Sequence, residues 1–466
     1  MPASRSCLLG NFALLFIFVG LAYAQQSARI YLPNLADEEW GFLQDPAFRT
    51  DFWDPLKYVP LGKEDWYLSL GGEARLSPQG FFIRKAESAA SIRDAYLLQR
   101  YLFSVDLRMG KRFRVFGEIQ SGLISGKLLS PRPTDKNVLD VHQAFVQYSS
   151  NKAPVDGRTV IRIGRQELTI GSSRLIAASQ GLNVKRSFDG ISGRHSRGKW
   201  AAAGAVARLV KIVPGAFDDP PDPAQDFWGV AVVRRHTMVS GSTLGAYYLG
   251  VDRKLSQYAQ GIGPESRHTF GLKIAGSAGR FDVNNDLIVQ AGTFAGLPVR
   301  AWAVSSSTGY RVGSGKIRPR ISISLNAASG DADPNDQRLE SFNPLFPGTS
   351  FSGIVGLFGP TNLFDVTPSI QAPLRRNLLL AFESPFYTRM SSGDGLYAID
   401  LRLLIPPGSN KALYVGANPG IIVSWQPYPH VGIVGAVTRF LPGAFLSDSI
   451  VAGGFSFYST AITYRF

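Results

Sequence analysis

Residues 96–121 read YLLQRYLFSVDLRMGKRFRVFGEIQS, and apolar and polar side chains alternate on both sides of Gly110. Before Gly110, Tyr101 and Phe103 share one side of the segment, while Arg100 lies on the other. This period of two predicts two adjacent β-strands, each with one apolar and one charged face. A soluble sandwich would bury the apolar face in a core, whereas a membrane barrel would turn it to lipid and point the charges into a lumen. The pattern alone leaves both open, so the rest of the chain must distinguish them.

The first 24 residues have the features of an export signal. Arg5 is their only charge, residues 8–21 form an apolar core, and residues 22–24 read AYA, a small-x-small cleavage site. The alternative is an N-terminal membrane anchor, but the apolar run is short for a spanning helix. Cys7 is the only cysteine of the chain. We therefore expect the mature chain, residues 25–466, to contain no disulfide and no cysteine-bound metal.

The alternation recurs along most of the mature chain, without a linker or a break in composition. With 49 Gly, 17 Tyr and 30 Phe among 466 residues, the composition suits strands that face lipid on one side. Spans of roughly ten residues, with turns and loops, give about 16 to 20 strands. Residues 25–64 show no clear period. The alternating segments are 66–76, 158–166, 269–275, 280–291 and 317–326, and two strands too apolar to alternate are 201–206 and 226–233.

The last nine residues, 458–466, read YSTAITYRF, so that Tyr464 and Phe466 share one face. This ending resembles the terminal signature of bacterial outer-membrane barrels, whose last strand ends in Phe and is read by the barrel assembly machinery. Closure is needed in lipid, because an open strand edge leaves unpaired backbone groups that cost several kcal/mol each. Together with the export signal, this ending predicts an all-β fold: a transmembrane antiparallel β-barrel in the Gram-negative outer membrane.

Three blocks of sequence resemble the alginate export family of Gram-negative outer membranes. They are residues 51–73, residues 164–190 and residues 330–363, although residues 76–79 depart from the family's usual run after the first block. The family-signature residues in the second block are Gly164, Arg165, Gln166, Glu167, Phe188, Asp189 and Gly190. The resemblance implies an 18-stranded, monomeric barrel with a long loop at about residues 328–373. It also implies a basic lumen through which an anionic polysaccharide leaves the periplasm, served by periplasmic export partners that the sequence does not identify.

Arginines concentrate on the polar side of the alternating strands and within the family-like blocks. Guanidinium groups suit uronate carboxylates because they donate two parallel hydrogen bonds and stay charged. Any single arginine is equally well explained as a solvated strand residue, but the set predicts a cationic channel. The expected lumen-lining residues are Arg75, Arg100, Arg108, Arg112, Arg114, Arg158, Arg162, Arg165, Arg174, Arg318 and Arg320.

Neither a metal nor an organic cofactor is predicted. The five histidines have no ligand-like spacing. Asp331, Asp333 and Asn335 match the start of a calcium loop, but Asp336 replaces its glycine and Phe342 stands where the bidentate glutamate is needed. A polar loop is therefore the better interpretation, and weak calcium binding is the alternative.

The favoured function is an outer-membrane channel that passes an alginate-like polyuronate outward. The first alternative is a porin that takes up small anions or sugar acids, and a remote one is an outer-membrane enzyme acting on lipid or polysaccharide. We expect no enzymatic activity, since no G-x-S-x-G elbow occurs. The formal net charge of +14 could suggest nucleic acid, but the predicted compartment argues against that partner. The expected surroundings are outer-membrane lipid and lipopolysaccharide.

Overall fold

A computed structural model describes residues 30–83, 92–150, 153, 156–235, 241–315, 317–348, 356–447, 449 and 452–466. The predicted export signal, residues 1–24, lies outside these residues. The helices of the described chain are single turns: η1 (Leu35–Asp37), η2 (Gly41–Gln44), η3 (Pro46–Phe48), α1 (Asp54–Lys57), η4 (Pro133–Asp135) and η6 (Ala444–Leu446). None of the helices in the described ranges has both the length and the apolar character needed to cross a membrane.

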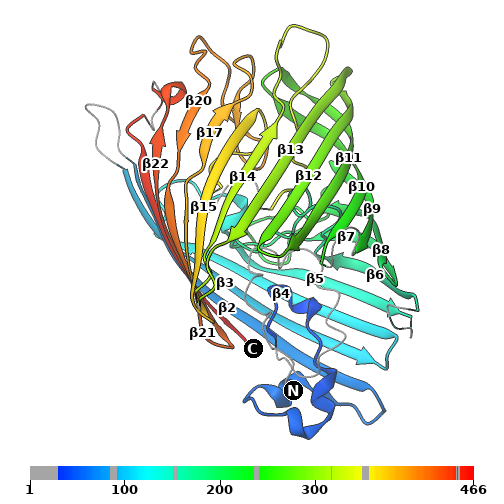
Figure 1. Ribbon diagram of the computed structural model, residues 1–466. Helices are drawn as coiled ribbons and strands as arrows, with labels where there is room; N and C mark the ends of the chain where they lie inside the picture. The colour runs from blue at the N-terminus through cyan, green and yellow to red at the C-terminus, as the bar shows by residue number, and fades with distance from the viewer. Residues whose placement is uncertain are drawn as a thin grey trace.

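Antiparallel strands close into a single barrel (Figure 1). Counted over the described residues, the barrel has 18 strands, as predicted, when β16 with β17 and β20 with β21 are each taken as one interrupted strand and the two-residue β1, which pairs beside β2, is left out. The bounds are β1 (Val59–Pro60), β2 (Trp66–Ile83), β3 (Ile92–Met109), β4 (Phe113–Ser125), β5 (Asn137–Ser149), β6 (Arg158–Gln166), β7 (Phe188–Arg197), β8 (Trp200–Leu209), β9 (Gln225–Arg235), β10 (Thr243–Tyr258), β11 (Gly261–Ala278), β12 (Phe281–Phe294), β13 (Leu297–Arg311), β14 (Arg320–Ala328), β15 (Leu363–Arg375), β16 (Leu378–Glu383), β17 (Phe386–Arg389), β18 (Leu396–Tyr397), β19 (Leu403–Ile405), β20 (Tyr414–Ala417), β21 (Gly420–Tyr428), β22 (Val431–Pro442) and β23 (Phe455–Arg465). The short strands β18 and β19 pair outside the barrel sheet.

Prolines interrupt the two broken strands at neighbouring points. Pro385 separates β16 from β17, and Pro419 separates β20 from β21. Proline has no N–H to donate to a ladder, so the pairing stops there and resumes beyond it. The amide of Asn418 donates to the carbonyl of Pro385 at 2.9 Å, which keeps the two interruptions in register.

The first and last barrel strands close the sheet. β2 pairs with β23 from Glu73↔Arg465 to Ile83↔Phe455, and β2 also pairs with β3 along its whole length. Closure gives both strands a partner on each side, as the cost of an open edge in lipid requires.

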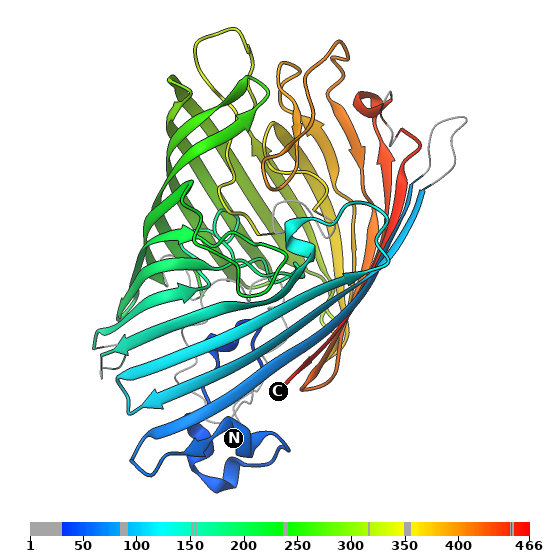
Figure 2. The ribbon, with the colours of Figure 1, turned by 180° about the vertical axis from the view of Figure 1, so that it is seen from behind.

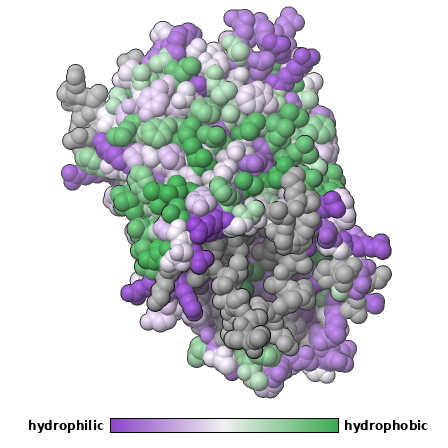
Figure 3. Space-filling view, in the orientation of Figure 1, coloured by the Kyte–Doolittle hydropathy of each residue, from purple (hydrophilic) through white to green (hydrophobic). Residues whose placement is uncertain are grey.

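The two faces of the wall follow the predicted alternation. In β3, Tyr101 and Phe103 are exposed on the outside, while Arg100 and Leu102 are buried on the inside. The turn between β3 and β4 uses Gly110 in the left-handed conformation, with φ of +66°. Apolar residues gather in a broad band over the outer face in Figure 3, below a hydrophilic upper rim. This is the surface that a membrane-spanning barrel presents to lipid.

The C-terminus and the single-turn helices η2, η3 and α1 (blue) lie at the bottom of the barrel in Figure 1, beside tight connections such as those before β4, β8 and β12. We call this the turn end, and the opposite end the loop end. Two loop-end segments run into the interior (Figure 2): residues 167–187, the first inward loop, and residues 329–348, part of the second inward loop. The connection that holds the second loop spans 329–362, shorter than the expected 328–373, because Leu363–Arg375 forms β15.

Candidate channel lumen and constriction

The structure places seven of the predicted lumen arginines on the inner face of the wall. Each shares the side of its strand that is opposite to exposed apolar residues, such as Ile161 and Ile163 in β6 or Ile321 and Ile323 in β14. The seven are Arg75, Arg100, Arg108, Arg114, Arg158, Arg162 and Arg320. An eighth, Arg174, lies on the first inward loop.

Three arginines lie elsewhere than predicted. Arg112 and Arg318 are exposed residues of turn-end connections, because β4 begins at Phe113 and β14 at Arg320. Arg318 lines a cavity of about 140 Å³ there with Arg280 and Arg311. Arg165 faces outward on the same side of β6 as Ile163, because the pairing of β6 with β5 and β7 continues through Arg165 without a register shift. It therefore points away from the lumen.

Most inner arginines are neutralised by carboxylates. The Nε of Arg100 donates to Glu73 at 2.7 Å, and that of Arg320 to Asp282 at 3.0 Å. Arg174 pairs with Asp286, which is fully buried. Charge-assisted bonds of this kind hold side chains in place, but a paired guanidinium adds little to the field in the water-filled lumen. The net potential therefore depends on the few arginines that are not matched.

The family-signature residues anchor the first inward loop at its two ends. On the outer face Arg165 makes a two-pronged pair with Asp189, at 2.8 and 3.0 Å. On the inner face Glu167 accepts from His142 at 3.0 Å and meets the Nζ of Lys185 at 2.5 Å. Burial acts against the charged form of Glu167, but Lys185 and His142 outweigh it and lower the pKa of Glu167 to about 2. The signature thus positions the loop, and its residues make these contacts within the protein itself.

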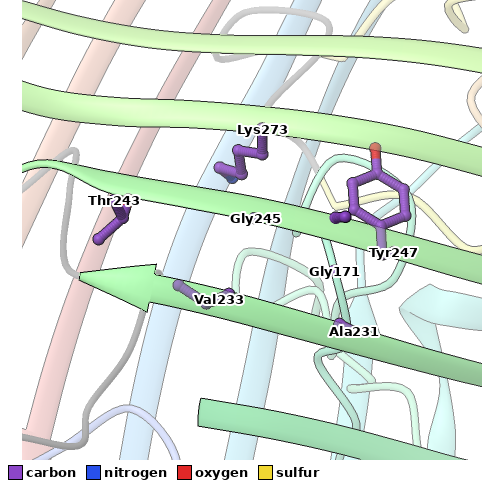
Figure 4. Close-up of a pocket in the computed structure, with 8 residues that line it drawn as sticks. Gly171, Ala231, Val233, Thr243, Gly245, Tyr247 and Lys273 are labelled. Carbon is purple, nitrogen blue, oxygen red and sulfur yellow. The ribbon is translucent and has the colours of Figure 1, made fainter. Parts of the chain in front are cut away.

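A third anchor lies where the first inward loop crosses β10. Gly171 has φ of +68°, and a Cβ there would lie 2.6 Å from the ring of Tyr247, so the close approach requires glycine. Figure 4 shows Tyr247 and Lys273 projecting from neighbouring strands beside this crossing. Ser172, the next loop residue, donates to Asp286 on β12 at 3.1 Å.

The second inward loop is fixed to β11 and β12 by a buried polar network. The side-chain amide of Asn343 donates to Glu265 at 3.0 Å, and its backbone amide donates to Oε1 of Gln290 at 2.9 Å. Arg267 joins these partners, donating to Glu265 at 2.6 Å, to Gln290 at 2.8 Å and to the carbonyl of Ser341 at 3.0 Å. Every charge in this group has a partner, which is the condition for stable burial of polar groups.

The two inward loops meet at Phe346 inside the barrel, and we call this contact and the residues around it the constriction. The amide of Ala177 donates to the carbonyl of Phe346 at 3.1 Å, and the amide of Phe346 donates to Leu175 at 2.9 Å. Two guanidinium groups lie over the Phe346 ring, Arg186 at 5.9 Å and Arg253 at 5.2 Å from its centre. Neither was among the predicted lumen arginines. Arg186 belongs to a family-like block and could have been added, whereas Arg253 lies in a segment without clear alternation.

Arg186 differs from the paired arginines in its partners. Its Nη1 donates to the carbonyls of Ala177, Phe346 and Pro347, at 2.7 to 3.2 Å. Over the described residues, no carboxylate lies within ion-pair distance of Arg186. Burial and the neighbouring Arg253 lower the pKa of Arg186 to about 10, which still leaves the group charged at neutral pH. The constriction therefore carries a positive charge that no ion pair within the described residues neutralises, although Asp400 acts on it from a longer distance.

The N-terminal segment enters the lumen from the turn end, which the sequence did not predict. Leu35 and Ala36 are buried against the inward-facing Leu102, Phe116 and Phe145. Its polar residues contact arginines of the wall, as described below. The described part of this segment, residues 30–58, shows no period because it consists of single-turn helices and connections and belongs to no strand before β1.

The C-terminal aromatics contact the N-terminal segment and β2. Phe466 exchanges two backbone hydrogen bonds with Gly72, at 3.0 and 3.1 Å, and its ring stacks on Trp53 at 4.3 Å. The indole of Trp53 also donates to the hydroxyl of Tyr464 at 2.6 Å. A Cβ at Gly72 would meet the Phe466 ring at 2.5 Å. The chain ends are thus packed together at the turn end.

Two groups of carboxylates have spacings that could suit a cation. Glu118, His142 and Glu167 lie together on the inner face, but Lys185 already supplies their positive charge. Asp140, Asp218 and Asp219 lie together on the loop-end rim. Their oxygens accept backbone amides, including those of Asp218 and Asp219 to Asp140 at 3.0 and 3.2 Å.

The polar loop at residues 331–336 is a series of turns. The amide of Asp333 donates to Asp331 at 3.1 Å, and the amide of Asn335 donates to Asp333 at 3.0 Å. Burial raises the pKa of Asp331 to about 6. Weak calcium binding at this loop stays a prediction.

The sequence profile for alginate export matches residues 66–452. The chain belongs to the alginate export family.

No curated protein matches it. Among solved structures, Pseudomonas aeruginosa OpdQ is similar at 11% identity, with a TM-score of 0.57, over 86% of this chain and 97% of that one. Acinetobacter baumannii OccAB4 is similar at 8% identity and a TM-score of 0.54, over 85% and 98%. The outer membrane protein opdK from Pseudomonas aeruginosa is similar at 12% identity and a TM-score of 0.54, over the same shares. These likenesses show the porin-like fold.

Proposed function

We propose that this alginate export family member passes an anionic, alginate-like polysaccharide from the periplasm to the cell exterior. The family and the closed 18-stranded barrel make the chain an outer-membrane channel. In barrels of this kind the short turns face the periplasm and the long loops face outward. The turn end, with Arg280, Arg311 and Arg318 around its cavity, is then the side from which the polymer enters.

The observation that carries the proposal is the unmatched charge of Arg186 at the constriction. Together with Arg253 it presents cationic groups where the two inward loops meet. A guanidinium binds a uronate carboxylate in a planar, two-pronged geometry. Because the backbone carbonyls already occupy part of Arg186, the added interaction is shallow, as conduction requires. A uronate polymer would move from one such weak site to the next.

A porin for small anions or sugar acids is the second candidate, and the docked loops favour it. The first and second inward loops are joined by two backbone hydrogen bonds at Phe346. A polymer would have to pass beside this contact or open it, whereas a small anion would only have to reach Arg186. In either case we propose a monomer that is embedded in lipid and lipopolysaccharide and has no enzymatic activity.

Selectivity measurements in planar bilayers test the charge at the constriction. In a potassium chloride gradient the wild-type protein should prefer chloride, and Arg186→Gln should reduce this preference. Arg208→Gln is the matched control, because Arg208 is half exposed on the outer face and pairs with Asp226. A cation-selective wild-type channel would contradict the proposal. So would an equal change in the two variants.

A further inference from the structure

Residues 33–39 form a short acidic strap along the inner wall, outside the part of the chain that the family profile matches. The strap ends in Asp37-Glu38-Glu39 and lies across β3, β4, β5 and β6. The wall residues beneath it are Arg108, Arg114 and Arg162, three of the arginines that the sequence predicts to bind the transported anion. Its position therefore bears on how that anion gains access to the wall.

The strap contacts each of these arginines. Arg114 donates to the carbonyl of Ala36 at 2.7 Å, and Arg108 reaches Glu39 at 3.1 Å and the carbonyl of Glu38 at 3.2 Å. Arg162 lies 3.5 Å from a carboxylate oxygen of Asp37. Two further donors hold the start of the strap, Lys185 on the carbonyl of Pro33 and Gln143 on the side chain of Asn34.

Charge balance explains why an acidic segment binds here. Arg108 and Arg114 share the single carboxylate of Asp106, at 2.9 Å and 2.6 Å from their Nε atoms. Arg162 donates to the neutral side chain of Gln147. The wall cluster therefore has two more positive charges than its own carboxylate neutralises, and Asp37 and Glu39 supply two negative ones. Because Asp37 is about a third exposed and Glu39 more than half exposed, both contacts stay accessible to competing anions.

The apolar residues of the strap bring it close to the wall. Leu35 and Ala36 pack on Phe116 and Phe145, and the same rings lie beneath the guanidinium groups of Arg114 and Arg162. The cluster thus offers both ring faces and charges, a surface that suits sugars bearing carboxylates. In this structure the chain's own residues occupy it.

We propose that Arg108, Arg114 and Arg162 form a carboxylate-binding subsite of the channel, and that residues 33–39 occupy it as an internal competitor of the transported polyanion. When the local concentration of the polyanion is high, the polyanion displaces the strap. When no polyanion is present, the strap blocks the passage of other solutes through this part of the lumen. This inference rests on the proposed function, because it takes the transported anion as a polymer of carboxylate-bearing sugars.

Neutralising the strap tests the competition. The double variant Asp37→Asn, Glu39→Gln should lower the concentration of oligouronate that half-blocks the current by about three- to tenfold, since each exposed ion pair is worth a fraction of a tenfold change. The matched control is Glu64→Gln, Asp65→Asn, which removes two charges at the same end, where Asp65 pairs with Lys111 outside the strap. The control should behave as wild type.

Locking the strap provides the second arm. In a Cys7→Ser background the chain has no cysteine, so Asp37→Cys, Arg162→Cys can be joined by a short bifunctional thiol reagent and released by a reducing agent. The locked channel should conduct less and be blocked less by oligouronate, and reduction should restore both. Asp65→Cys, Lys111→Cys, joined in the same way, should change neither.

The outcomes separate this inference from the proposed function. Equal half-blocking concentrations in the neutralised variant and its control would overturn the strap as a competitor, and so would equal block of the locked and released channel. The proposed function would survive either result. If oligouronate blocks none of the variants, including the one with a neutral strap, the polyuronate function and the competition both fail.

Discussion

Ile323 and Ser324 are neighbours in β14 that face different surroundings. Ile323 is exposed on the outer face at 46%, while Ser324 faces the interior and donates to Ser307 at 3.0 Å. The same substitution at the two positions therefore separates lipid from water. Because the two positions are adjacent in β14, only the direction of the side chain differs between them. The comparison is therefore a sensitive check of which face of β14 is turned to lipid.

We expect Ile323→Arg to destabilise the folded barrel by roughly 2 to 4 kcal/mol, because it places a charge against the hydrocarbon near the midplane. Ser324→Arg should cost little, because its charge can reach lumen water. The measurement is the free energy of unfolding by urea in lipid vesicles. Equal losses at the two positions would mean that the inner and outer faces of β14 are assigned wrongly.

At the scale of elements, one of the charged contacts that hold the first inward loop titrates in acid. Glu167 has its pKa lowered to about 2 by Lys185 and His142 against the effect of burial, compared with an ordinary 4.5. A carboxyl whose folded pKa is lowered stabilises the folded form fully above its ordinary pKa. That contribution, up to about 3 kcal/mol, is lost as the pH falls from about 4.5 toward 2.

We therefore expect the first inward loop to undock in acid between about pH 4.5 and 2. A fluorophore on Gly181→Cys, an exposed loop position, should change its emission over that range in the wild-type background. In a Glu167→Gln background the emission should already be altered at neutral pH and should not follow this titration. A transition of the same size and midpoint in both backgrounds would show that Glu167 does not control docking.

The sequence predicted alternation where inner faces are mainly polar, and it predicted residues 201–206 and 226–233 as strands without alternation, because their inner faces are apolar. β3, β4 and β12 alternate because polar residues face the lumen. β10 does not, since Tyr247, Leu249 and Val251 lie inside it in the core under the inward loops. An inner face covered by a loop becomes apolar, and the period of two disappears.

The candidate site was predictable in part for the same reason. Alternation placed seven arginines on the inner face, but it carries no information on pairing, so it could not show that Arg100 and Arg320 are neutralised. Alternation also placed Arg112 and Arg318 on the inner face, although both lie in connections. Arg165 was assigned to the lumen from the family-like block, without the strand register that turns it outward. The strap was missed entirely, because a segment that crosses strands has no period of its own.

At the scale of the whole molecule, closure joins the two ends of the chain. β23 pairs with β2, and Phe466 adds two backbone hydrogen bonds to Gly72 and a stack on Trp53. The stack alone is worth about 0.5 to 1.5 kcal/mol. If Phe466 is also the residue read by the assembly machinery, deleting it should have a larger effect than removing the ring stack alone.

Deleting Phe466 should therefore strongly reduce the yield of barrel in the outer membrane, whereas Trp53→Ala should lower thermal stability with near-normal yield. Both changes remove the ring stack, but only the deletion removes the terminal aromatic. Yield and heat-modifiable gel mobility measure the difference. Comparable yields for the two variants would limit Phe466 to a packing role.

The most direct measurement of the channel's function is the block of single-channel current by oligouronates, compared with neutral oligosaccharides of equal length. The wild-type protein should be blocked transiently by the uronates and far less by the neutral sugars. The block should weaken from 0.1 M to 1 M salt, because the screening length falls from about 10 Å to about 3 Å. Chloride selectivity without any uronate block would favour the small-anion porin, and equal block by charged and neutral oligomers would contradict polyanion transport guided by the arginines.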